Sequence, residues 1–266
     1  EELFFPLHAL RPSLVPDFRW FGLRYCNARA TRFSRFDTSG SSRSGELSWL
    51  LRRAFMLRLR KQDVLGDLPP KLCDVRRVSS SSPGALIRLA ELSEQLEDAS
   101  ASRLKSVVSE MFRATCDAKL SSVSAYVVHR ARQSPVLAFA HHRSMLDALC
   151  AGGESAGLRV CRMDGDTPMS ARQSMVDSIQ SGECAVDLAC FSMAVAGVGF
   201  TLTSMSRVVF CELPWNPALL RQCEDRVYRI GQTRACHIEY LLCDGTLDDH
   251  VWRRIHEKEK VTNRSI

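Results

Sequence analysis

No long apolar run occurs in this sequence of 266 residues. A membrane-spanning helix needs ~20 consecutive apolar residues, and no stretch of the chain comes near that length. The opening residues, EELFFPLHAL, also lack the basic segment of a secretory signal. We therefore expect no membrane partner, and either a start further upstream or a chain of the cytosol or nucleus.

Closely paired cysteines are missing as well. The 11 cysteines form no C-x-x-C pair, and most lie inside apolar runs such as VDLAC and RVVFCEL. Structural zinc sites need closely spaced ligand pairs, whereas disulfide scaffolds are short and secreted. We interpret the thiols as small buried hydrophobic groups in a reducing compartment, and we expect no metal site.

Charge is present but unevenly distributed. The net charge is +6; residues 1–78 contribute +7, from 15 Lys and Arg against 8 Asp and Glu, and the remainder contributes −1. A basic excess of this kind fits a polyanionic partner, because each phosphate contact releases counterions. A solvated helix face would show the same excess, so the charge leaves both interpretations open.

The composition, 45% hydrophobic and 25% charged, is that of a globular protein with roughly one to two domains. Residues 1–78 are basic and irregular, with a periodic stretch, ELSWLLRRAFMLRLRKQDVLGDL, that should be helical up to Pro69. Residues 79–118 begin with SSSSPG and predict a helical linker, with helices near 83–98 and 101–118. From residue 119 onward, short apolar strands alternate with amphipathic helices.

This alternation predicts an α/β fold, with a parallel sheet covered by helices on both faces. The expected strands are 135–140, 159–163, 185–190, 207–213 and 237–243. The expected helices of this part are 120–131, 145–149, 168–180, 217–229 and 246–260. Functional residues should then lie in the loops beyond the carboxyl ends of the strands.

Two of these loops have unusual sequences. Asp164-Gly165-Asp166-Thr167 leads into a helix whose first amides suit an anion, although a plain turn capped by Thr167 fits equally. After Cys190, the glycines at 197 and 199 permit tight backbone geometry and close approach to a ligand. Neither loop alone supports a functional prediction.

The strongest signal is the segment ELPWNPALLRQCEDRVYRIGQT. Pro217 suits a first helical position and Gly231 a helix stop, so the spacing predicts one helix face that carries Gln222, Arg226 and Arg229. Guanidinium groups suit spread phosphoryl charge, as in an arginine finger. The alternative is a surface helix in which the neighbouring acidic residues 224 and 225 pair with these arginines.

Together with PWNP, the stretch QCEDRVYRIGQ resembles motif VI of the Swi/Snf-type DNA-dependent ATPases of helicase superfamily two. The similarity runs through nearly the whole chain. Its motifs occur in the family's order: FGLRYCNA, SGSSRSGEL, MLRLRKQDVLGDLPPK, VLAFAHHRSMLDAL, MDGDT, GFTLTS, VVFCELPWNP, CEDRVYRIGQT and DGTLDDHVW. The FAHH segment and Glu212 in ELPWNP make the chain most similar to the SMARCA-like annealing-helicase branch, which remodels stalled replication forks.

The resemblance implies that residues 119–266 form a RecA-like second helicase lobe, preceded by the helical linker 79–118. Residues 1–78 would be the end of the first lobe and its helical protrusion. The chain contains neither a G-x-x-x-x-G-K-[ST] motif nor a D-E-x-H-type motif. ATP with Mg²⁺ is therefore expected to be bound mainly by a first lobe outside this chain. We interpret the chain as a C-terminal fragment that is inactive alone.

Site residues also follow from the resemblance. Arg226 and Arg229 would be catalytic, at the phosphates of ATP, and Gln222 would anchor their motif at the interface between the lobes. Gly197 and Gly199 would hold motif V between ATP and DNA.

Three further groups follow in the same way. The resemblance implies DNA contacts in two loops and structural support in a third: Asp164, Gly165 and Thr167; His141, His142 and Arg143; and Trp215 and Asn216. Asp166 stands where the family usually has Ser or Thr, and its carboxylate would repel a phosphate.

The implied function is ATP-driven translocation on duplex or branched DNA, in annealing, replication-fork processing and repair in the nucleus. Single-strand-binding protein or chromatin would be partners through regions outside this chain. One alternative is a chromatin-remodelling ATPase of the same family. The other is a non-catalytic DNA-binding or protein-binding module that lacks the ATP-binding lobe.

Overall fold

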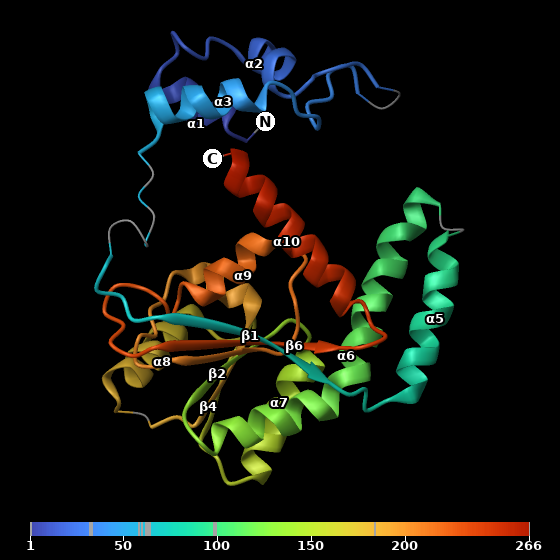
Figure 1. The fold of residues 1–266 in the computed structure, drawn as a ribbon, viewed down its shortest axis with the longest axis vertical. Helices are drawn as coiled ribbons and strands as arrows, with labels where there is room; N and C mark the ends of the chain where they lie inside the picture. Colours follow the sequence, from blue (N-terminus) through green and yellow to red (C-terminus); the bar gives the residue numbers. More distant parts are fainter. Residues whose placement is uncertain are drawn as a thin grey trace. The chain divides into compact units, whose positions relative to one another are not determined.

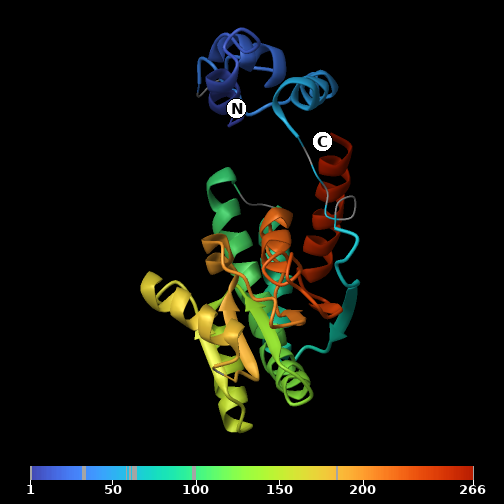
Figure 2. The same cartoon turned by 90° about the vertical axis from the view of Figure 1, so that its left-hand side faces the viewer.

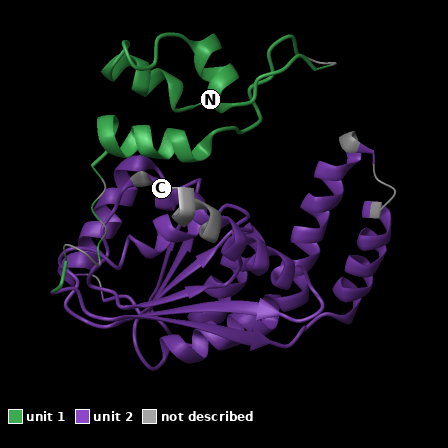
Figure 3. Cartoon of the chain, turned by 45° about the horizontal axis from the view of Figure 1, so that its top comes forward, with its two compact units in different colours: residues 1–66, 259–266 green, residues 67–258 purple. Residues whose placement is uncertain are grey.

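The computed structural model describes residues 2–31, 34–57, 59, 61, 65–97, 100–183 and 185–265. The chain forms two compact units (Figure 3): residues 1–66 with 259–266, and residues 67–258. None of the helices that the structure describes is long and apolar enough to cross a bilayer.

Six parallel strands form a single sheet in the larger unit, in the order β1-β6-β5-β2-β4-β3 (Figure 1). The strands are β1 Lys71–Val78, β2 Val136–Ala140, β3 Val160–Met163, β4 Leu188–Ser192, β5 Arg207–Phe210 and β6 Cys236–Cys243. Register is fixed in the middle of the sheet, where Leu137 lies opposite Ala189 on one side and Val208 on the other. The predicted α/β fold class is confirmed, and all five strands expected from the sequence are present.

Strand β1 was not predicted. Most of its residues are exposed, four of the eight are charged, and it pairs with β6 alone at the edge of the sheet. An edge strand with polar faces shows no apolar run, so its residues carry no strand pattern that could be recognised. The structure assigns residues 67–78 to the same compact unit as the other strands.

Helices cover both faces of the sheet (Figures 1 and 2). One face packs on α8 (Met169–Ser181), α9 (Pro217–Glu224) and α10 (Asp248–Ser265). The other packs on α6 (Ala101–Ala131) and α7 (Arg143–Ser155). Along β2, Leu137 and Phe139 belong to the first core and Val136, Ala138 and Ala140 to the second, because successive side chains of a strand point to opposite faces. Burial on both faces explains why β2 reads as a continuous apolar run.

Helix α6 is a single helix of 31 residues, where the sequence predicted separate helices near 101–118 and 120–131. Neither Gly nor Pro interrupts the stretch between them, so nothing ends the helix. Helix α5 (Pro83–Glu97) begins at Pro83 as predicted and packs on the first half of α6. The predicted linker boundary after residue 118 therefore falls inside a continuous helix.

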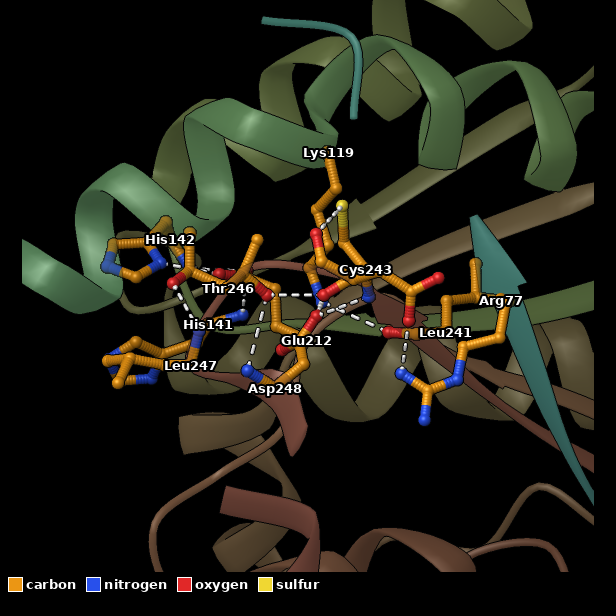
Figure 4. A network of polar contacts seen from close by, with 12 residues as sticks. Arg77, Lys119, His141, His142, Glu212, Leu241, Cys243, Thr246, Leu247 and Asp248 are labelled. Atoms are coloured by element: carbon orange, nitrogen blue, oxygen red, sulfur yellow. Dashed lines mark hydrogen bonds and ion pairs between the residues drawn. The ribbon is translucent and has the colours of Figure 1, made fainter. Parts of the chain in front are cut away.

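A buried ion pair ties α6 to the start of α10 (Figure 4). Lys119 is fully buried; its Nζ lies 2.8 Å from Asp248 Oδ2 and donates to the carbonyl of Leu241 at 3.0 Å. Asp248 also accepts the amide of Cys243 at 2.9 Å. Both charges are paired and hydrogen-bonded, which is the condition for burying them.

The smaller unit contains α1 (Phe4–Leu10), α2 (Phe18–Tyr25), α3 (Ser44–Leu50) and a π-helical turn η1 (Leu51–Phe55). Its small core consists of Phe4, Leu7, Val15, Phe21, Tyr25 and Cys26. The predicted basic, mainly helical region is confirmed. The helix expected to run to Pro69 ends at Phe55, and residues 58, 60 and 62–64 of that stretch lie outside the described part.

Candidate functional site at the carboxyl edge of the sheet

The predicted site residues lie in loops that follow parallel strands. Since β2, β3, β4 and β5 all run the same way, the loops after them open at one edge of the sheet. Residues 141–143 follow β2, 164–167 follow β3, 193–199 follow β4 and 211–217 follow β5. The topology thus gathers segments that are far apart in the sequence.

Glu212, after β5, holds the loop after β2. Its Oε2 accepts the amides of His141 at 2.7 Å and His142 at 2.9 Å, and its Oε1 lies 2.5 Å from Nδ1 of His142 (Figure 4). Burial by itself would raise the pKa of Glu212, but the contacts with His142 and the two amides outweigh it and lower the pKa to about 2. The carboxylate is therefore ionised and fully engaged.

Cys116 of α6 completes a group of three ligand-type side chains with His142 and Glu212. Their ligand atoms all lie within 4.8 Å of one another. Burial raises the pKa of the Cys116 thiol to about 12, and its described hydrogen-bond partner is the Ser144 hydroxyl at 3.5 Å. A cation would have to displace the thiol proton and the contact between His142 and Glu212. The group fits a hydrogen-bonded cap better than a metal site.

The loop after β3 is held by its own side chains. Asp164 Oδ1 accepts the amide of Asp166 at 3.0 Å, and Thr167 Oγ1 accepts the amide of Asp164 at 3.1 Å. Arg172 of α8 donates to the carbonyls of Asp164, Gly165 and Thr167, at 3.1, 3.0 and 2.8 Å. Arg172 was missed by the sequence analysis, because three contacts with backbone carbonyls leave no mark in a motif.

An exposed ion pair joins these first two loops. Arg143 Nη1 lies 2.7 Å from Asp166 Oδ2, and about 70% of each side chain is accessible to solvent. Asp164, by contrast, turns toward Arg162, whose Nε lies 2.7 Å from its Oδ2. Burial would raise the pKa of Asp164, but the contact with Arg162 outweighs it and lowers that pKa.

The loop after β4 begins with a 3₁₀ turn, η2 (Met193–Val198), which Ser192 caps by accepting the amide of Ala194 at 3.4 Å. Gly199 ends it at φ +80°, a left-handed conformation that favours glycine. Gly197 has no such constraint: a Cβ there would meet no other atom within 4 Å. Among the residues that the structure describes, none therefore requires glycine at position 197.

The helix after β5 is shorter than predicted. Asn216 caps α9 by accepting the amide of Ala218 at 2.9 Å, and Pro217 takes the first position as expected, but the helix ends at Glu224. Arg226 and Arg229 lie in the turns beyond it, so the prediction that they share one helix face with Gln222 is wrong.

The reason for the early end is tertiary. Glu224 is buried; its carboxylate binds Lys71 of β1 and accepts the hydroxyl of Tyr240 at 2.6 Å. The carbonyl of Arg226 accepts the amide of Leu202 at 2.8 Å, which draws the backbone out of the helical path. The alternative in which Glu224 pairs with the arginines is thereby excluded.

Within the described part of the chain, Arg226 and Arg229 carry their charges without an acidic partner. Among the described residues, no carboxylate lies within 4 Å of either guanidinium, and Nε of Arg226 is buried without a hydrogen-bond partner. Arg226 donates to the carbonyl of Phe200 at 3.4 Å and lies over its ring, while Arg229 donates to Thr201 Oγ1 at 2.8 Å. Burial, and then the charge of Arg229, lowers the pKa of Arg226. Two neighbouring cations with spare donors form a ready site for an anion.

Trp215 connects this edge to two helices. Its ring meets Phe112 of α6 edge-on at 5.7 Å and stacks on His250 of α10 at 6.4 Å. Lys258 of α10 lies 5.5 Å from the ring and donates to the Trp215 carbonyl at 3.3 Å. Gln222, predicted at an interface between lobes, has an exposed side chain.

Residues 118–231 match the family described as helicase conserved C-terminal domain. Over 270 residues the chain is 37% identical to the SWI/SNF-related matrix-associated actin-dependent regulator of chromatin subfamily A-like protein 1 of Xenopus tropicalis, covering 99% of this chain. It is 34% identical over 281 residues to the DNA annealing helicase and endonuclease ZRANB3 of Mus musculus, covering 100% of this chain.

The chain spans only 28% and 26% of the length of these two relatives. Among solved structures, the crystal structure of the C-terminal part of the Fun30 ATPase domain matches with a TM-score of 0.58 at 16% identity, covering 71% of this chain and 90% of that one. At that identity the match shows the fold alone, a RecA-like lobe.

Proposed function

This chain carries the helicase C-terminal domain of the Swi/Snf family, and from that premise we propose that it is the second lobe of an ATP-dependent DNA translocase. The whole protein would anneal DNA and remodel replication forks in repair, in the nucleus. The names of the two relatives, an annealing helicase and a chromatin regulator, support this class. Residues 1–66 would be the end of the first lobe with its protrusion, and residues 67–258, which form one compact unit, would belong to the linker and the second lobe.

The observation that carries the proposal is the pair Arg226 and Arg229. Two guanidinium groups without a carboxylate partner among the described residues, one with a buried unpartnered Nε, fit the phosphates of ATP. Bound ATP with Mg²⁺ would supply the phosphoryl group to be transferred and the metal that neutralises its charge. Held mainly by another lobe, it would meet these arginines when the lobes close, and their charge would stabilise the phosphoryl oxygens.

The loops after β2 and β3 are proposed to contact DNA. His141 and Arg143 offer exposed or half-exposed donors, and the backbone around Gly165 is held rigid by Arg172, which favours a fixed contact with a phosphate. His142 and Asp164 would act indirectly, because Glu212 binds Nδ1 of His142 and Arg162 binds Oδ2 of Asp164.

The remaining residues would connect the two binding regions. Gly199, with its positive φ, would shape motif V beside the arginines. The exposed Gln222 would contact the first lobe, and Trp215 with Asn216 would set the start of α9.

The test is DNA-stimulated ATP hydrolysis by the complete gene product and its Arg229→Ala variant. An arginine finger is worth ~10³ to 10⁵ in rate, so we expect the variant to lose stimulation altogether. Arg132→Ala is the matched control, because this exposed arginine follows α6 and precedes β2, and its loss should leave the rate unchanged. The present chain alone should not hydrolyse ATP.

Two outcomes would redirect the proposal. A rate within about tenfold of wild type for Arg229→Ala would contradict the assignment of the arginines. A complete product without hydrolysis would favour the non-catalytic binding module, and stimulation by nucleosomes over free DNA would favour the chromatin remodeller.

A further inference from the structure

Glu212 performs for α7 the task that a capping residue performs for other helices. The N-cap position of α7 is His142, whose side chain makes no capping hydrogen bond to the helix. The amides of His141 and His142 are instead accepted by a carboxylate 70 residues further along the chain. Amides that lead into a helix need an acceptor, and negative charge is favourable at that end of the helix dipole.

The same carboxylate fixes the imidazole of His142, which cannot then point elsewhere. Glu212 is 6% exposed, and each of its oxygens is engaged, so the contact is not a passing surface pair. A phosphate at this helix end would meet a charge of its own sign. Of the three side chains in this loop, those of His141 and Arg143 are the exposed ones, and we assign the contact with DNA to them.

Glu212 also stands at the start of the segment that leads to the arginines. Four residues after it, Asn216 caps α9, and Trp215 packs on α6 and α10. One side chain thus joins the proposed DNA loop after β2 to the segment that precedes the proposed ATP-site arginines.

We propose that Glu212 is a positioning residue, whose reach across the edge of the sheet orients His141 and Arg143 toward the DNA backbone. The inference rests on the proposed function for its DNA contact. It assigns no chemical step to Glu212. The three hydrogen bonds that Glu212 accepts, rather than its charge, orient the loop after β2.

Two conservative variants of the complete protein separate the effect of the side-chain length of Glu212 from the effect of its negative charge. Glu212→Asp keeps the charge but shortens the side chain by one methylene, so it cannot serve both amides and the ring. Glu212→Gln keeps the reach and an acceptor oxygen but loses the charge. We expect the DNA concentration for half-maximal ATPase stimulation to rise at least threefold in Glu212→Asp and tenfold in Glu212→Ala. It should stay within twofold in Glu212→Gln, with kcat at saturating DNA changed less than threefold in all.

Asp187→Ala is the matched control. Asp187 accepts the amide of Arg159 at 2.9 Å and binds its guanidinium, but it precedes β4 at the opposite edge of the sheet. Its loss should lower the melting temperature without moving the half-maximal DNA concentration. Wild-type DNA dependence in Glu212→Asp and Glu212→Ala overturns the proposal, as does an effect of Glu212→Gln equal to that of Glu212→Ala.

Hydrogen exchange of residues 141–146 in the 266-residue chain decides the question even if the proposed function fails. If the wild-type protein shows no DNA-stimulated hydrolysis, the proposed function is rejected. The positioning role of Glu212 is then decided by hydrogen exchange alone. Faster exchange in Glu212→Asp than in wild type or Glu212→Gln supports the role, and equal exchange in all three overturns it.

Discussion

At the scale of single residues, Asp166 competes with DNA for Arg143. The two side chains form an exposed ion pair at 2.7 Å, between the loops proposed to contact phosphates. We expect Asp166→Ser to tighten DNA binding by about two- to fivefold, because it frees one cation and removes one like charge, and exposed pairs are worth ~0.2 to 1 kcal/mol. The plot of log affinity against log salt should steepen by about one unit.

Fluorescence anisotropy of a labelled duplex at two salt concentrations measures both quantities. Asp177→Ser makes the same change of charge at an exposed position of α8, where Asp177 pairs only with Gln173 among the contacts described for it. Equal effects of the two substitutions would mean that net charge alone, and not the release of Arg143, changes the affinity.

A second prediction at this scale concerns acid. The pKa of Glu212 is lowered from 4.5 to about 2 in the folded protein, so its contribution to stability is complete above pH ~4.5 and is lost as the pH falls toward 2. The full shift corresponds to about 3 kcal/mol. Urea unfolding of Glu212→Gln between pH 6 and 3 should therefore show a shallower decline with acid than wild type.

The exposed Glu183 provides the control, because Glu183→Gln removes a carboxylate without disturbing a described side-chain contact. If the free energy of unfolding falls with acid as steeply in Glu212→Gln as in Glu183→Gln, other carboxylates determine the loss of stability at low pH. Asp187, whose pKa is lowered to about 2 by its contacts with Arg159, should keep part of the slope in both variants.

At the scale of elements, the buried pair of Lys119 and Asp248 holds α10 to the sheet-bearing unit. Lys119→Met leaves a buried carboxylate without its cation, and breaking such a pair costs about 3 to 5 kcal/mol. Urea titration should show this loss. The double variant Lys119→Met/Asp248→Asn should recover part of it, because no uncompensated charge remains.

The exposed pair of Arg88 and Glu110, which joins α5 to α6, serves as the comparison. Arg88→Met should cost much less than Lys119→Met, since water screens both charges of the exposed pair. Similar losses in Arg88→Met and Lys119→Met would contradict the account of the buried pair.

Some helices and strands of this fold could be predicted from the sequence, and others could not. Strands such as β2 and β4 are buried on both faces and were predicted from their apolar runs. The end of α9 could not be predicted, because the contact of Glu224 with Lys71 joins residues 153 positions apart. Glu212 was noticed only as a mark of similarity, since its partners lie 70 positions away and periodicity reports local neighbours alone.

At the scale of the whole molecule, sequence motifs identified most residues of the candidate site. The topology explains why these residues lie together. Parallel strands bring their following loops to one edge, so the loop found as FAHH contacts both the loop found as MDGDT and the one found as ELPWNP. The electrostatic state of the site was beyond prediction. Whether an arginine has an acidic partner depends on side chains that only the folded chain brings near.

The pairing of β1 with β6 has a consequence for synthesis. The first strand of the sheet in sequence, residues 71–78, pairs with residues 236–243, so this edge cannot form until residue 243 has left the ribosome. Contacts between such distant segments fold slowly, and an unpaired strand can meanwhile join another chain. The charged residues of β1, among them Arg76 and Arg77, would keep nascent chains from associating along this edge during the delay.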